Sequence, residues 1–179
     1  LGYVPQKAVL FSGDIASNIL YGNPDGSEAE MTEAATIAQA TEFIEQKKKK
    51  YKSTISQGGS NVSGGQKQRL SIARAIAKHP DVYIFDDSFS ALDYKTDATL
   101  RAKLKEKTSE STVMIVAQRI STILHADQII VLDDGQIVGK GTHKELLKNC
   151  EAYYQIASSQ LSEKELEEDL KEVESYAER

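Results

Sequence analysis

The chain has 179 residues, of which 40% are hydrophobic and 27% charged, a composition typical of one globular domain or one large lobe of a larger domain. Its net charge of −5 argues against nucleic-acid binding, which normally uses a basic surface. The single cysteine, Cys150, excludes an internal disulfide and indicates a reducing compartment. No run approaches the roughly 18 apolar residues of a membrane span. The sequence opens at LGYVPQ without Met, and we expect it to be a piece of a longer protein.

The first part of the chain is predicted to be mainly helical after an initial strand. The expected elements are a strand over 1–5, a short helix near 14–20, a helix from 27 to about 40 and another at about 41–49. Ser27 and Glu30 form a capping box, in which each side chain satisfies a backbone N–H of the other. Because this helical segment is inserted between strands, we expect a separate helical lobe.

Strands and helices alternate in the rest of the chain, which indicates an α/β architecture. Capping boxes at Ser63 and Gln66 and at Thr142 and Glu145 mark two further helix starts. The expected elements are a helix from 64 to just before Pro80, a strand over 82–86, a helix at about 94–107, a strand over 112–118, a hairpin over 127–141 turned at Asp134-Gly135, and helices to about 158.

The last twenty residues form an acidic tail that carries the whole net charge. A narrow apolar stripe runs along it, spaced as on one face of a helix: Leu166, Leu170, Val173 and Ala177. Docking on a partner, folding back on the body and fraying in solvent are the alternatives. We expect a peripheral helix of little energetic weight.

The stretch NVSGGQKQR at 61–69 combines a serine hydroxyl, two glycines and a helix N-terminus. These groups together form a site for anionic oxygen. The alternative is an ordinary capped helix with a flexible entry. Capping explains Ser63 and Gln66 but not the consecutive Gly64 and Gly65, which are entropically unfavourable at a helix start. The stretch alone does not decide between the two.

The stretch VYIFDD at 82–87 is an apolar run that ends in Asp86 and Asp87. Buried parallel strands end in this way when they deliver carboxylates to the edge of a sheet, where metal-bound phosphates often lie. No G-x-x-x-x-G-K-[ST] phosphate loop occurs in the chain. The pattern therefore predicts one part of a phosphate site whose other part is missing.

Taken together, these motifs resemble those of the ATP-binding cassette (ABC) transporters. NVSGGQKQRLSIARA is similar to the family's signature motif, VYIFDD to its Walker B strand, SALD to its D-loop, VPQ to its Q-loop and AQRISTILHAD to its switch region. The resemblance implies a partial RecA-like P-loop NTPase core with an inserted α-helical subdomain and no Walker A part. It implies a Q-loop strand and loop at 1–13, the helical subdomain at 14–80, the later part of the core at 81–158 and the acidic tail at 159–179.

The resemblance also assigns roles to individual residues, with ATP and Mg²⁺ as cofactors of the intact protein. Gln6 would bind Mg²⁺ and the attacking water, and Asp86 would hold Mg²⁺ directly or through water. Asp93 would communicate across a dimer of ATPase domains. The residues that would contact ATP bound by the partner are Ser63, Gly64, Gly65 and Gln66.

Two positions depart from the family pattern. Asp87 replaces the usual glutamate that orients the attacking water, which retracts the carboxylate by about 1.5 Å. A displacement of about 1 Å can cost on the order of a hundredfold in rate. Gln118 replaces the usual switch histidine, and it cannot carry that residue's proton or charge. Together they resemble the degenerate-site subunit of a heterodimeric multidrug exporter.

The intact protein is then expected to export amphipathic, drug-like compounds, with this segment on the cytoplasmic face of the cell membrane. Its partners would be a transmembrane domain and a second ATPase domain, and this chain alone is expected to be inactive. One alternative is a non-catalytic fragment that only docks to a partner. Another is a soluble ABC-type ATPase of DNA repair or translation, against which LFSGDIASNILYG and GTHKELL argue.

Several residues are expected to have only structural roles. Tyr3 and Tyr21 are assigned to packing, because the family's adenine-stacking aromatic lies upstream. The three histidines, among them His143, have no metal-ligand spacing. We expect them to contact solvent or neighbouring side chains.

Overall fold

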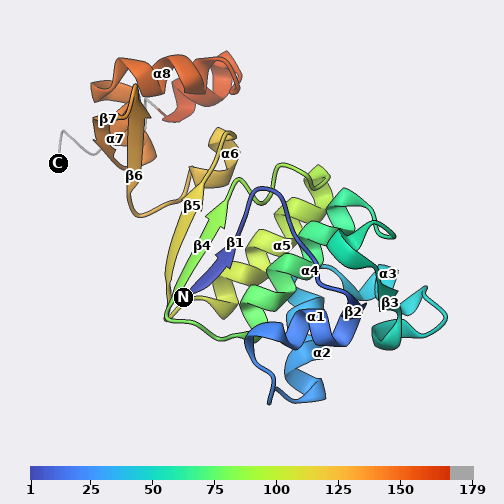
Figure 1. The fold of residues 1–179 in the computed structure, drawn as a ribbon. Coiled ribbons are helices and arrows are strands. Elements are labelled where there is room, and N and C mark those ends of the chain that lie inside the picture. The colour runs from blue at the N-terminus through green and yellow to red at the C-terminus, as the bar shows by residue number, and fades with distance from the viewer. Residues whose placement is uncertain (170–179) are drawn as a thin grey trace. The chain divides into compact units, whose positions relative to one another are not determined.

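The computed structural model describes residues 1–169 and divides into two compact units, Leu1–Val116 and the residues from Ala117 onward. Each unit is described by itself. The α/β fold expected from the sequence is confirmed (Figure 1). The bounds of the four predicted segments stay predictions.

A three-stranded parallel sheet forms the framework of the first unit (Figure 1). Its strand order is β1 (Gly2–Val4), β4 (Val82–Asp86) and β5 (Thr112–Val116). Tyr3 pairs with Ile84, which pairs with Met114. The expected strand 112–118 ends at Val116, which pairs with Asp86, the last residue of β4.

The predicted helices of this unit are present, and the second and third of them end several residues earlier than expected. They are α1 (Ile15–Ile19), α2 (Glu28–Ile37), α3 (Thr41–Glu45), α4 (Gly64–Ala77) and α5 (Tyr94–Lys107). The α3 helix ends at Glu45, and Lys50, five residues later, has a positive φ of 44°, which a continuous helix does not contain. The smaller elements are β2 (Gly13–Asp14) paired with β3 (Thr54–Ile55), and the 3-10 turns η1 (Leu20–Gly22), η2 (Lys50–Lys52) and η3 (Gln57–Gly59).

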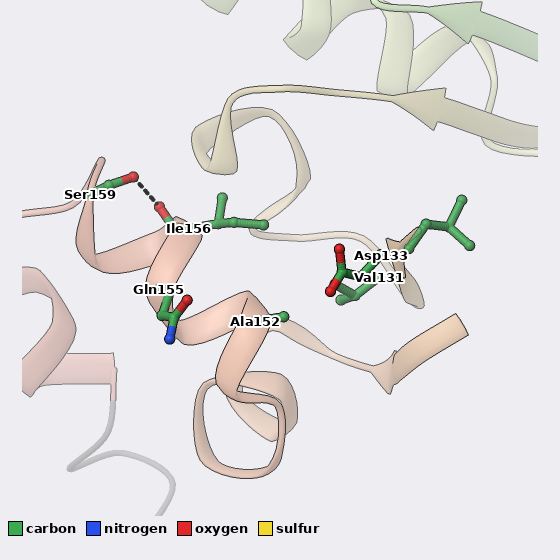
Figure 2. A pocket seen from close by; sticks show the side chains of 7 residues that line it. Val131, Asp133, Ala152, Gln155, Ile156 and Ser159 are labelled. Carbon is green, nitrogen blue, oxygen red and sulfur yellow. Dashed lines mark hydrogen bonds between the residues drawn. The ribbon is translucent and has the colours of Figure 1, made fainter. Parts of the chain in front are cut away.

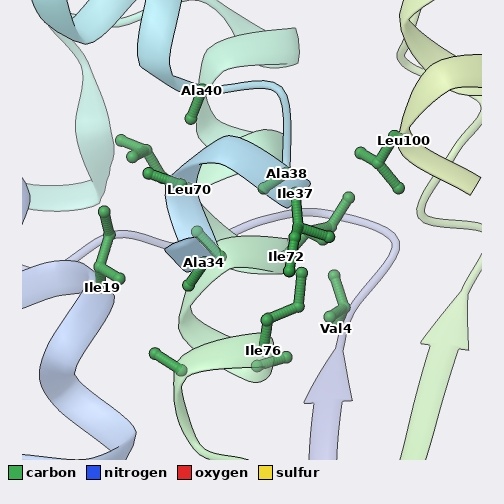
Figure 3. Close-up of a cluster of buried hydrophobic side chains, with 14 of the residues drawn as sticks. Val4, Ile19, Ala34, Ile37, Ala38, Ala40, Leu70, Ile72, Ile76 and Leu100 are labelled. Atoms are coloured by element: carbon green, nitrogen blue, oxygen red, sulfur yellow. The ribbon is translucent and has the colours of Figure 1, made fainter. Parts of the chain in front are cut away.

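Helix α4 passes through the centre of the core of this unit. Its Leu70, Ile72 and Ile76 are buried together with Val4 of β1, and Figure 3 shows these side chains in one cluster. The capping boxes predicted at Ser27 and Ser63 are both formed. Helix α4 is therefore fixed along its length by packing and at its start by its cap.

The opposite face of the sheet is partly exposed. Tyr3, Met114 and Val116 are each more than half exposed on this face. Parallel strands normally have both faces covered by helices. Strand β5 thus has the apolar composition of a buried strand, although its side chains on this face are exposed as in an edge strand.

The second unit consists of a hairpin and short helices. Its elements are α6 (Ile120–Ile123), β6 (Ile129–Asp133), β7 (Gln136–Gly141), α7 (His143–Asn149), α8 (Glu151–Ser158) and a helical segment at 163–169. The hairpin turns at Asp134 and Gly135, both with positive φ, as predicted. The predicted box of Thr142 and Glu145 caps α7.

A buried hydrogen-bond chain connects α7, α8 and the start of the tail. His143 Nδ1 lies 2.7 Å from the Tyr153 hydroxyl, and its Nε2 lies 3.1 Å from Asp169 Oδ2. A carboxylate only accepts, so Nε2 of His143 carries a proton and donates to Asp169. In a neutral imidazole ring, Nδ1 then accepts from the Tyr153 hydroxyl. The structural role expected for His143 is confirmed.

The described part of the tail packs on this unit. Leu166 is 7% exposed and belongs to the apolar cluster that includes Tyr153. Burial of a leucine side chain contributes about 1.5–3 kcal/mol, which argues against the expectation of little energetic weight. The other three stripe residues, Leu170, Val173 and Ala177, lie outside the described residues. Within residues 1–169, no helix has the length and apolar content needed to cross a membrane.

Tyr153 is predicted to make stability depend on pH at high pH. Burial, and then the charge of Asp169, raise the pKa of Tyr153 from 10.0 to about 12. The folded state holds this proton more tightly than the unfolded chain. The protonated Tyr153 therefore contributes fully to the free energy of unfolding below about pH 10, and this contribution is lost as the pH rises through about 12. Between about pH 10 and pH 12 the parent protein should therefore lose about 2–3 kcal/mol of its free energy of unfolding through this group, and Tyr153→Phe should abolish this loss.

Urea unfolding of both proteins from pH 8 to pH 12 measures this difference. At pH 8 the variant should be about 1 kcal/mol less stable, because the hydrogen bond to His143 is gone. Lysine deprotonation affects both proteins alike. Parallel stability curves up to pH 12 would contradict the prediction.

Candidate functional site

The end of β4 and the loop after β1 bring two carboxylates together with two donors. The Tyr3 hydroxyl donates to Asp86 Oδ2 over 3.1 Å, and Gln6 Nε2 donates to Asp87 Oδ2 over 3.1 Å. Both contacts follow from the pairing of β1 with β4, since the carboxyl ends of parallel strands meet at one edge. The structure therefore places Gln6, Asp86 and Asp87 in one site.

Asp87 is held in an uncommon backbone conformation. Its φ is +44°, in the left-handed region, where aspartate is enriched among non-glycine residues. Its N–H donates to the Val116 carbonyl over 2.9 Å, and the residue is buried. The next residue, Ser88, is fully buried and donates to the Val4 carbonyl over 2.8 Å. Backbone strain of this kind persists where the surroundings fix it, and it is common at functional sites.

These residues fit a magnesium ion that is completed by other ligands. Carboxylate and amide oxygens are the hard ligands that Mg²⁺ prefers, and Gln6 keeps its amide oxygen because its Nε2 faces Asp87. No group of three or more His, Cys, Asp or Glu that could hold a metal occurs within residues 1–169. Protein sites for Mg²⁺ often provide one or two carboxylates and take the remaining ligands from phosphates and water.

Tyr3 makes a polar contact that was not expected from the sequence. Its side chain is 53% exposed, and its hydrogen bond to Asp86 raises the pKa of the phenol. Tyr21 is also exposed, but it stacks on Phe11 at 4.3 Å between ring centroids, as packing would require. The polar contact of Tyr3 was not expected, because strand register, which local sequence does not show, places its hydroxyl beside a carboxylate.

The signature stretch forms the N-terminus of α4 and faces open space. Ser63 is the N-cap: its hydroxyl accepts the Gln66 N–H over 3.2 Å, while Gln66 Oε1 accepts the Ser63 N–H. A Cβ atom added at Gly64 would meet nothing within 4 Å, and one at Gly65 would only reach the Ala91 carbonyl at 3.5 Å. Neither glycine has a positive φ. Nothing within the described chain therefore requires glycine at these two positions.

Helix α4 also holds the loop that contains Gln6. Gln68, which is 2% exposed, donates to the Pro5 carbonyl over 3.2 Å. Arg74 donates to the carbonyls of Val9 and Asn18 over 3.0 and 2.9 Å. The helix that presents the glycines is thus fixed to the backbone on both sides of Gln6.

Asp93 caps α5 in this structure. Its carboxylate accepts the Thr96 N–H over 3.0 Å, and hydrogen bonding to Thr96 lowers the pKa of Asp93, with a smaller contribution from Arg69. Its role across a dimer stays a prediction. Gln118 belongs to the second unit, where its carbonyl accepts from Gln160 over 2.9 Å. The place of Gln118 beside the two carboxylates likewise stays a prediction.

A groove of about 360 Å³ lies in the second unit between β6 and α8. Figure 2 shows its lining, which includes Val131, Asp133 and Ile156. None of the residues predicted for the site lines it. The candidate site is therefore the carboxylate edge and the α4 N-terminus of the first unit.

The comparison with protein families identifies the chain's relatives. The sequence pattern of the family described as ABC transporter matches residues 1–90, half of the chain. The chain belongs to the ABC transporter family.

Similar curated proteins include transporters of the same family. The chain is 48% identical over 163 residues to an uncharacterized ABC transporter ATP-binding protein of Mycobacterium tuberculosis, covering 89% of this chain and 28% of that protein. It is 41% identical over 160 residues to a putative multidrug export ATP-binding/permease protein of Staphylococcus aureus, with the same coverage. The chain thus spans 28% of the length of these relatives.

A solved ABC transporter has the same fold over most of the chain. The structure of a bacterial Atm1-family ABC exporter with ATP bound superimposes with a TM-score of 0.85 at 36% sequence identity. The match covers 90% of this chain and 28% of that one. The chain is therefore the ABC ATPase fold in part, matching an ABC exporter structure.

Sequence reasoning missed two residues of this site, Tyr3 and Gln68. Gln68 lies within the signature stretch, but it has no sequence signal of its own beyond that of a polar residue on a buried helix face. Its partner, Pro5, is 63 positions away in the sequence. Only the packing of α4 against the end of β1 brings them together.

Gln68 is predicted to protect the loop after β1 from proteolysis. Gln68→Met keeps the side-chain length but leaves the Pro5 carbonyl unpaired, a local cost of about 1–3 kcal/mol. Trypsin should then cleave after the exposed Lys7 about tenfold faster, since about 1.4 kcal/mol corresponds to a factor of ten. Mass spectrometry detects the loss of residues 1–7.

Ile76→Val is the matched control for this experiment. Ile76 is buried on the same helix, and its replacement by valine costs about 1 kcal/mol of stability without removing a hydrogen bond to the loop. Cleavage at Lys7 should stay near the parent rate in this variant. If the Gln68 variant were cleaved no faster than the control, the hydrogen bond would not restrain the loop.

Proposed function

We propose that this chain is the later part of the nucleotide-binding domain of an exporter that couples ATP binding and hydrolysis to transport. One observation carries the proposal. Strand β1 and the loop after it hold Asp86 and Asp87 through Tyr3 and Gln6. Helix α4 connects this loop to an open, glycine-containing helix start. A carboxylate edge binds metal-associated phosphate, and such a helix start binds anionic oxygen. ATP and Mg²⁺ provide both.

The two parts of the site serve different nucleotides in this proposal. Asp86 and Gln6 would hold Mg²⁺ through oxygen atoms, and the ion would supply charge neutralisation at the phosphates. Ser63, Gly64 and Gly65 would meet phosphate bound to a second ATPase domain. The open space at both glycines supports an approach from outside the chain.

We also propose that the site formed with Asp87 and Gln118 turns over poorly, as in the degenerate half of a heterodimer. Efficient hydrolysis needs a metal ligand, a base for the water and a switch residue in one place. This chain keeps Asp86, which would hold the metal, but has Asp87 at the position of the base and Gln118 at the position of the switch residue. Gln6 further occupies one oxygen of Asp87, which limits its access to water.

The transported compounds are proposed to be amphipathic and drug-like. The support is the name of the Staphylococcus aureus relative, a putative multidrug export protein with ATP-binding and permease parts. The partners would be a transmembrane domain and a second ATPase domain. This segment would then lie at the cytoplasmic face of the membrane.

The chain by itself is predicted not to bind ATP tightly. The sequence contains no phosphate loop, whose backbone N–H groups and lysine supply much of the phosphate affinity in P-loop proteins. Calorimetric titration of the 179-residue chain with Mg-ATP should give no saturable binding in the micromolar range. Saturable micromolar binding would show that this part of the chain holds a complete site.

Substitutions in the intact heterodimer should separate the two halves of the site. Ser63→Arg places a bulky cation where a small hydroxyl meets phosphate, and it should reduce ATPase activity by about a hundredfold or more. Asp87→Asn should leave most of the activity, because the partner's site carries the turnover. Asp87→Glu combined with Gln118→His should raise turnover at this site.

Ser109→Arg is the control for adding an arginine, since Ser109 is exposed and lies after α5, outside the signature stretch. It should retain the parent activity. If Asp87→Asn abolished hydrolysis completely, the site would be an ordinary catalytic one and the degenerate assignment would be wrong.

A further inference from the structure

We propose that Tyr3 is a positioning residue for Asp86, whose hydroxyl holds one carboxylate oxygen and leaves the other for the metal ion. The inference rests on the proposed function, in which Asp86 binds the Mg²⁺ of ATP. Tyr3 would act through Asp86 and not touch the ion or the nucleotide itself.

Strand register brings the two side chains to the same face of the sheet. Tyr3 pairs with Ile84, and Asp86 follows two positions later on β4. Because side chains alternate between the faces of a strand, Ile84 and Asp86 point to the same side as Tyr3. A phenol is long enough to reach diagonally across this spacing, and its hydroxyl lies 3.1 Å from Asp86 Oδ2.

The hydroxyl group is what distinguishes Tyr3 from a purely apolar aromatic residue at this position. The side chain is half exposed, whereas its strand neighbours Gly2 and Val4 are buried on the other face. The specific contact that distinguishes tyrosine from phenylalanine here is the hydrogen bond to Asp86.

The contact leaves Asp86 Oδ1 available. Within residues 1–169, the Asp86 carboxylate makes no other hydrogen bond. A hydrogen bond to Oδ2 restricts rotation of the carboxylate, so Oδ1 keeps one orientation. Mg²⁺ requires nearly ideal octahedral geometry, which makes its binding sensitive to the orientation of each ligand.

The neighbouring carboxylate is held by a different residue. Gln6 donates to Asp87, so the two carboxylates are fixed separately by two residues three positions apart. Loss of the Tyr3 hydroxyl should therefore affect the metal ligand and leave the contact of Asp87 intact. Partners of this kind, which orient a metal ligand, typically contribute a factor of about 10–100 to metal affinity.

Mn²⁺ titration followed by electron paramagnetic resonance tests the proposal in the longer protein that supplies the phosphate loop, with a non-hydrolysable ATP analogue bound. Tyr3→Phe should raise the Mn²⁺ dissociation constant about tenfold. Affinity for the metal-free analogue should stay unchanged. Tyr21→Phe is the matched control, because Tyr21 is equally exposed and its hydroxyl makes no hydrogen bond with the described residues.

Asp86→Asn separates failure of this inference from failure of the proposed function. Asp86→Asn should weaken Mn²⁺ binding strongly, and adding Tyr3→Phe to it should have no further effect. If Asp86→Asn weakens Mn²⁺ binding while Tyr3→Phe stays within about twofold of the parent, below the range expected for such partners, the positioning role of Tyr3 is wrong. If Asp86→Asn itself has no effect, the proposed metal site is wrong, and the role of Tyr3 falls with it.

Discussion

The parallel pairing of β1 with β4 is the constraint on which the candidate site depends. It joins residues that are 81 positions apart, such as Gln6 and Asp87, at one edge of the sheet. A shift of one residue in this register would turn Tyr3 to the opposite face and separate it from Asp86. The buried hydroxyl of Ser88, bonded to the Val4 carbonyl, holds the end of this pairing where the strands stop being regular.

Helix α4 provides the second fixed element. Its apolar side chains are buried in the core, so the helix has little freedom to move independently of β1. Its N-terminus is nevertheless free of packing at Gly64, and its Gln68 holds the backbone beside Gln6. One rigid element thus connects the open, glycine-containing helix start with the carboxylate edge.

The second unit contains a polar network of a different kind. Tyr153, His143 and Asp169 form a chain in which each donor has one acceptor, and the apolar cluster around it includes Leu166. Burial strengthens such hydrogen bonds and makes each partner costly to remove. This network ties the start of the tail to the hairpin unit, a function that the acidic composition of the tail does not indicate.

The sequence by itself determined the local elements and the family. Capping boxes at Ser27, Ser63 and Thr142 and the turn at Asp134-Gly135 are formed as predicted, because each depends on residues within four positions of one another. The short pair of β2 and β3 and the cap of α1 by Asp14 and Ser17 were not predicted, since two-residue strands carry no periodic signal.

Only the tertiary structure decided the contacts between distant segments. Strand register placed the Tyr3 hydroxyl beside Asp86, and the packing of α4 placed Gln68 beside Pro5. Asp87, whose backbone is left-handed, likewise donates its N–H to Val116 on the neighbouring strand. The motifs predicted the candidate site residues. The residues that hold them in position are determined by packing across the sheet, which depends on contacts between segments that are distant in the sequence.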